Sequence, residues 1–159
     1  MEQKFFSKWL KVILIGVAIC GLVVYAFVVP IYGLNLRSLY PEFSNRFWPW
    51  IIFIWVSGIP CFMVLYYAWR IVANIGKDQS FTDKNASMLK SISVLSALDA
   101  TFFFAGNIVL LFLNMSHPGV VIASFVIIFV GVAVAVASAT LSHLVKKASA
   151  LQEQSDWTI

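Results

Sequence analysis

Charged side chains are scarce in this sequence. Asp, Glu, Lys and Arg make up only 11% of its 159 residues, whereas apolar side chains make up 61%. Ordinary soluble domains are about one quarter charged. The shortage of charge excludes a disordered chain and a nucleic-acid-binding module. It indicates an integral membrane protein with little mass outside the bilayer.

Side chains that form disulfides or bind metals are also rare. The chain has only 2 cysteines and 2 histidines, which is too few for a disulfide scaffold. Both cysteines, Cys20 and Cys61, fall in apolar segments, where a free Cys packs as a small apolar group. The sequence also lacks a glycine-rich phosphate loop and paired carboxylates. We therefore expect no enzyme activity, no cofactor and no metal site.

Long uncharged runs dominate the sequence. A membrane-spanning helix needs about 20 mostly apolar residues. Four stretches have this length: 12–31, 48–69, 91–115 and 119–145. The third contains one charge, Asp99, whose cost of insertion is outweighed by its apolar neighbours. The predicted fold is all-α: a single integral membrane domain, residues 1–159, that forms a four-helix bundle.

The Lys and Arg residues predict how the chain is oriented. Nine of the 11 lie in the N-terminal tail, in residues 70–90 between the second and third spans, or in the C-terminal tail. Only Arg37 and Arg46 lie on the other side. Because cytoplasmic segments carry the excess of Lys and Arg, we expect both termini and the hairpin at 70–90 in the cytoplasm. The protein is then a multi-pass protein of the inner (cytoplasmic) membrane of a bacterium.

The cytoplasmic hairpin carries recognisable helix signals. Gly76 is a suitable C-cap for the second helix, and Thr82 followed by Asp83 is a suitable start for the third. Phe81 precedes the cap and can pack as a hydrophobic staple. Two interpretations are open: the hairpin packs on neighbouring helices and lipid, or it forms a docking surface for a soluble partner. The residues expected at a docking surface are Phe81, Thr82, Lys84, Asn85, Leu89 and Lys90.

Asp99 is the most informative residue inside the predicted spans. Counting from the basic residues that flank each span places Cys20, Cys61, Asp99 and Ser138 at a similar depth near mid-membrane. A carboxyl group in such a position is a candidate functional group.

Three interpretations of Asp99 compete. It is protonated and hydrogen-bonded to Ser96, Ser138 or a carbonyl freed by Pro60; or it is a proton or cation site in a transport path; or it binds a metal with the cysteines. The metal interpretation is the weakest, because the ligands share no motif spacing.

Two further features concern helix shape and packing. Gly58 and Pro60 predict a kink in the second helix, because proline lacks an N–H and clashes with the preceding turn. Asn107 extends the polar side of the third helix beyond Asp99. We expect this side to pack on small residues of the fourth helix, within one bundle or across a homo-oligomer.

Residues 76–92, GKDQSFTDKNASMLKSI, resemble a bacterial family of unknown function, DUF2975. The most recognisable part is Phe81-Thr82 followed by Asn85-Ala86 and Leu89-Lys90. The resemblance implies a small four-helix membrane protein with no assigned activity or ligand residues. It also implies a frequent genomic pairing with a small helix-turn-helix regulator. We therefore expect a membrane regulator or scaffold that docks such a protein and does not itself bind nucleic acid; the alternative is a small transporter or channel subunit that uses Asp99.

Overall fold

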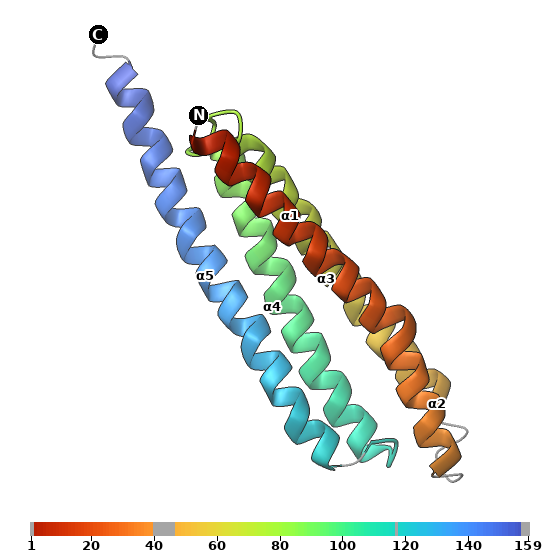
Figure 1. Ribbon diagram of the computed structural model, residues 1–159. Coiled ribbons are helices and arrows are strands. Elements are labelled where there is room, and N and C mark those ends of the chain that lie inside the picture. The colour runs from red at the N-terminus through yellow and green to blue at the C-terminus, as the bar shows by residue number, and fades with distance from the viewer. Residues whose placement is uncertain (1, 40–46, 117, 157–159) are drawn as a thin grey trace.

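The structure is a computed structural model that describes residues 2–39, 47–116 and 118–156 (Figure 1). Arg46, one of the two basic residues assigned to the outer side, lies outside these residues. Every element in the described part of the chain is helical. In chain order the elements are α1 (Glu2–Val23), a π-helical turn η1 (Val24–Val28), α2 (Val29–Leu39), α3 (Phe47–Ile75), α4 (Asp83–Phe112) and α5 (Pro118–Asp156).

In the described part of the chain, four helical segments are long and apolar enough to cross a membrane. They are Gln3–Leu39, which combines α1, η1 and α2, and then Phe47–Ile75, Asp83–Phe112 and Gly119–Ser155. The predicted all-α membrane fold of four helices is thereby confirmed.

Successive long helices run in alternating directions (Figure 1). The N-terminus, the C-terminal end of α5 and the turn between α3 and α4 lie at one end of the molecule, the upper end in the figure. The end of α2 and the connection between α4 and α5 lie at the other end. This arrangement agrees with an even number of crossings, whereas the side that faces the cytoplasm stays a prediction.

Within this fold the helices pack in the order α1, α3, α4, α5. The α4–α5 pair has the most extensive contact, and the described part of α1 contacts neither α4 nor α5. Glycines allow close approach along the row: a Cβ at Gly131 of α5 would lie 3.2 Å from the Cβ of Ala100 in α4. Small residues permit such packing between membrane helices. The outcome is an open layer in which α3 is exposed between α1 and α4.

The first long helix contains one π-helical turn, and Pro30 explains it. The N–H of Val29 bonds to the carbonyl of Val24 in this turn, which leaves the carbonyl of Tyr25 without that donor. The next residue, Pro30, has no N–H to offer. The indole Nε1 of Trp55 in α3 donates to the Tyr25 carbonyl instead, at 3.1 Å. A backbone group that would be costly to leave unpaired in lipid is thus satisfied by the neighbouring helix.

The predicted kink at Gly58 and Pro60 does not interrupt α3, which continues as a single helix from Phe47 to Ile75 with Pro60 inside it. Gly58 is buried, and its role is visible in packing. A Cβ at this position would lie 3.0 Å from the ring of Tyr25. The missing side chain therefore makes room for Tyr25 of η1.

Candidate functional site

The turn between α3 and α4 is organised around one buried amide side chain, that of Asn85. Asn74 Nδ2 donates to Asn85 Oδ1 at 2.7 Å, and Asn85 Nδ2 donates to the carbonyls of Gln79 (2.7 Å) and Ser80 (3.0 Å). The backbone N–H of Asn85 donates to the Thr82 hydroxyl, the predicted N-cap, at 3.3 Å. Because these bonds join both ends of the turn, the turn has a fixed shape.

The ends of α1 and α5 are held against the same region. Ser7 Oγ of α1 donates to the carbonyl of Val72 at 2.8 Å, and Ser142 Oγ of α5 donates to the carbonyl of Ala86 at 2.7 Å. Gly76 lies close to α1, since a Cβ there would be 2.7 Å from Ser7 Oγ. Gly76 is the predicted C-cap of α3, but its φ is not positive. The residue after α3 that adopts the left-handed backbone conformation is Asp78 (φ 60°).

These contacts create a hollow at the end of the molecule where both termini lie. Its volume is about 390 Å³, and its wall comes from α1, the turn and α5. The lining residues are Gln3, Asp78, Gln79, Ser80, Phe81, Thr82, Asp83, Ser149, Gln152 and Glu153. All of these residues are polar except Phe81.

The residues predicted to dock a partner separate into two groups. Phe81, Lys84 and Lys90 are exposed, whereas Asn85 is 1% exposed. Asn85 uses its side chain within the turn, so its assignment to a docking surface is corrected: it shapes the turn. Phe81 is 56% exposed, so less than half of its surface is available for the predicted packing as a hydrophobic staple. The remaining two predicted docking residues, Thr82 and Leu89, are partly buried.

A second group of polar side chains lies inside the predicted membrane layer. Cys61 Sγ of α3 donates to Asp99 Oδ2 of α4 at 3.6 Å. The side chain of Tyr25 in η1 lies near those of Ser57 and Cys61. The buried Oδ1 of Asp99 has no hydrogen-bond partner within the described part of the chain. We call these four side chains, from three helices, the Asp99 cluster.

The other predicted intramembrane polar residues do not join the Asp99 cluster. Ser96 is buried, and Asn107 Nδ2 bonds to the carbonyl of Phe103 in its own helix at 2.8 Å. The expected hydrogen bond from Asp99 to Ser96 or Ser138 is therefore corrected, because Cys61 is the bonded side chain.

The predicted depth of Ser138 is corrected by the register of α4 and α5. Ser142 bonds to the carbonyl of Ala86, so Ser138, one turn earlier in the antiparallel α5, lies level with about residue 90. That position is about 13 Å from Asp99 along the helix. The prediction failed because Lys146 was used as a depth marker. The end of α5 extends past the other helices, as Figure 1 shows, so Lys146 lies farther out than assumed.

A metal site at the Asp99 cluster is not supported. No group of three His, Cys, Asp or Glu side chains in residues 2–39, 47–116 and 118–156 could hold a metal ion. Cys20 and Cys61 are both free thiols.

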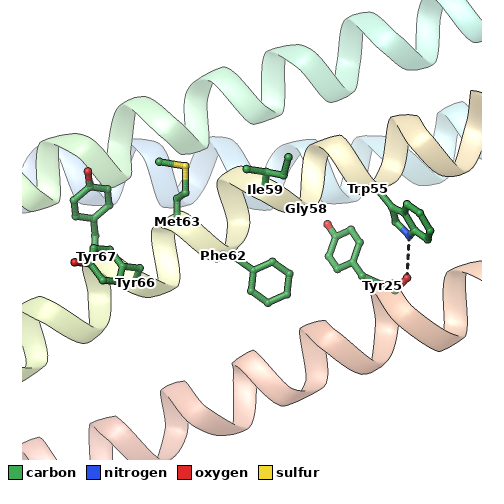
Figure 2. A pocket seen from close by; sticks show the side chains of 8 residues that line it. All are labelled: Tyr25, Trp55, Gly58, Ile59, Phe62, Met63, Tyr66 and Tyr67. Carbon is green, nitrogen blue, oxygen red and sulfur yellow. Dashed lines mark hydrogen bonds between the residues drawn. The ribbon is translucent and has the colours of Figure 1, made fainter.

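An apolar groove runs along α3 beside η1 (Figure 2). Its volume is about 560 Å³. The lining residues are Tyr25, Trp55, Gly58, Ile59, Phe62, Met63, Tyr66 and Tyr67. The groove exists because α1 and α4 both pack on α3 without contacting each other, and because Gly58 has no side chain.

Sequence reasoning did not identify Tyr25, Ser57 or Trp55. The sequence did contain a signal for Tyr25 and Trp55. Pro30 in an apolar span leaves a carbonyl of the preceding turn unpaired, so a donor such as an indole is required nearby. Which residue of another helix supplies that donor depends on the register between the helices. The same register decides that Ser57 lies near Tyr25.

Comparisons with known proteins give a family without an assigned activity. A family described as "Protein of unknown function (DUF2975)" matches residues 32–159. A relative in Bacillus subtilis (strain 168), described as "Uncharacterized membrane protein YoaS", is 29% identical over 154 residues, which cover 94% of each chain. No solved structure matches this chain. The chain is thus a membrane protein that belongs to the DUF2975 family.

Proposed function

We propose that the protein is a non-enzymatic scaffold or regulator of the bacterial inner membrane that docks a small helix-turn-helix regulator at its cytoplasmic end. The observation that supports this most is the exposed Phe81 at the rim of a polar hollow, on a turn whose shape is fixed by Asn85. An exposed aromatic ring on a rigid support is typical of an interaction surface, because little conformational entropy is lost on binding.

The hollow has a chemistry that suits such a partner. Asp78, Asp83 and Glu153 line it together with neutral polar groups. A basic side chain of a partner can approach these carboxylates while an apolar neighbour covers Phe81. DNA-binding proteins carry basic surfaces, so a small DNA-binding regulator has groups of the required charge. This proposal also relies on the pairing implied by the family resemblance.

Photo-crosslinking in cells tests the proposal. A photoreactive phenylalanine analogue at position 81 should crosslink a helix-turn-helix regulator, which mass spectrometry identifies. The matched control is position 112, because Phe112 is 82% exposed at the far end of α4, the helix that begins two residues after Phe81. Crosslinking of the regulator from position 81 alone supports the proposal. Its absence from position 81, or equal yield from both positions, contradicts it.

The Asp99 cluster favours a second candidate function, a proton or cation site in a small transporter or channel subunit. The observation behind it is the buried, unpartnered Oδ1 of Asp99 beside Cys61. Ionisable groups at this depth commonly serve ion pathways. Purified protein in proteoliposomes should then carry proton or cation flux that Asp99→Asn abolishes. Absence of flux in the wild type, or flux that survives the substitution, excludes this candidate.

A further inference from the structure

We propose that the groove along α3 binds an anionic phospholipid, with one acyl chain against the apolar wall and the phosphate at Arg70. This inference concerns a different surface from the hollow at Phe81 and does not depend on the partner proposed there.

The groove has the size and lining of a ligand site. A volume of about 560 Å³ falls within the range of about 300–1,000 Å³ that is usual for small-molecule pockets. Its wall includes Trp55, Ile59, Phe62 and Met63. Aromatic and aliphatic side chains of this kind offer van der Waals contact to a hydrocarbon chain.

The distance from Gly58 in the groove wall to Arg70 is close to the thickness of one leaflet of a bilayer. Gly58 and Arg70 are twelve residues apart in α3, which corresponds to about 18 Å along the helix. Half of the hydrocarbon core of a bilayer is about 15 Å thick. An acyl chain whose headgroup lies at Arg70 therefore reaches Gly58, where the ring of Tyr25 forms part of the groove wall.

Arg70 has the geometry of a phosphate ligand. Its Nη1 donates to the hydroxyl of Tyr66 at 2.8 Å, and its guanidinium lies 5.7 Å from the centre of the same ring. Tyr66 is part of the groove wall, so this contact holds Arg70 at the end of the groove. Arg70 is exposed, and no carboxylate bonds to it within the described residues. A guanidinium has five N–H donors, so several stay available for phosphate oxygens.

A second cation lies at the same level on the neighbouring helix. The ammonium of Lys11 in α1 is 5.5 Å from the ring centre of Trp69, the residue next to Arg70. Arg70 at the groove, with Lys11 at the same level on α1, favours an anionic lipid over other occupants. A neutral lipid gains only the hydrocarbon contact, and a second copy of the chain would need to bring an anion to this position.

Native mass spectrometry tests the proposal on the full-length chain. The protein is released from detergent that contains equal amounts of phosphatidylglycerol and phosphatidylcholine, and the retained lipids are counted. We expect the wild type to retain phosphatidylglycerol about fivefold over phosphatidylcholine. Arg70→Gln should lower this ratio, because only Lys11 then remains as a cation at this level. Arg37→Gln, the matched control, changes an exposed arginine at the other end of the molecule and should leave the ratio unchanged.

A groove-filling variant tests the acyl-chain part independently of charge. Ile59 is 60% exposed and lines the groove, so Ile59→Trp should reduce retention of both lipids. Circular dichroism verifies that each variant is folded. Equal retention of the two lipids by the wild type would overturn the proposal. So would an unchanged ratio in Arg70→Gln, or unchanged retention in folded Ile59→Trp.

Discussion

The indole of Trp55 replaces a backbone N–H that Pro30 cannot supply. Trp55 Nε1 lies 3.1 Å from the carbonyl oxygen of Tyr25, within the π-helical turn that precedes Pro30. This bond joins the first long helix to α3 near the Asp99 cluster. It also holds Tyr25 where its ring packs on Gly58 and borders the lipid groove.

Trp55→Phe should therefore destabilise the fold by about 1–2 kcal/mol, because the Tyr25 carbonyl loses its donor in an apolar environment. Unfolding in mixed micelles with increasing SDS measures the change. Trp9→Phe is the control, since the described contacts of Trp9 include a ring contact with Phe5 but no hydrogen bond. In a Pro30→Ala background the loss should shrink, because residue 30 then has an N–H of its own. An equal loss in both backgrounds would contradict the assignment.

Gly106→Ala should weaken the α3–α4 contact, by about 1–3 kcal/mol. An added Cβ would overlap the ring of Phe53, which itself packs against the rings of Phe102 and Phe103. Gly16→Ala is the matched control, since nothing lies within 4 Å of its added Cβ. The control should be neutral or slightly stabilising, because alanine favours helix. Thermal unfolding followed by circular dichroism distinguishes the two variants, and equal effects would argue against the packing.

Asn85→Ala should open the turn between α3 and α4. Without the Asn85 side chain, the carbonyls of Gln79 and Ser80 lose the hydrogen bonds that Asn85 Nδ2 donates to them. The expected cost is about 2–4 kcal/mol of local stability. Limited proteolysis of inverted membrane vesicles should then cut this turn at least tenfold faster. Lys84→Ala, at an exposed neighbouring position, should be cut at the wild-type rate. Unchanged cleavage of the Asn85 variant would show that the turn is held by other contacts.

Asp99→Leu should leave the fold as stable as the wild type or make it more stable, by up to about 3 kcal/mol. The reason is that Asp99 places an unpartnered oxygen in the apolar layer, which is a cost to stability. Leu98 is 62% exposed and faces away from the Asp99 cluster. Leu98→Asp is the converse variant, because it adds a carboxyl group to the apolar layer. It should lower stability in the same SDS titration. Strong destabilisation by Asp99→Leu would show that the carboxyl group is a structural element.

The helices could be predicted from the sequence because long apolar runs must form helices in lipid, where each backbone group needs an internal partner. The start of α4 at Thr82 could also be predicted, since capping is a local property. Asn85 was misassigned because its burial depends on Asn74, eleven residues away in another helix. The predicted depth of Ser138 was wrong for a similar reason. The register of α5 is set by packing, which cannot be read from the spacing of basic residues.

The proposed function requires that the turn after α3 faces the cytoplasm, together with both termini. Cysteine accessibility measures this orientation, in a background in which Cys20 and Cys61 are replaced by alanine. Gln79→Cys and Ser38→Cys place exposed thiols at opposite ends of the molecule. With a membrane-impermeant maleimide on intact spheroplasts, we predict that position 38 is labelled and that position 79 is labelled only after permeabilisation. Labelling of position 79 in intact spheroplasts would show that the turn faces the outside, and the proposed cytoplasmic docking surface would be excluded.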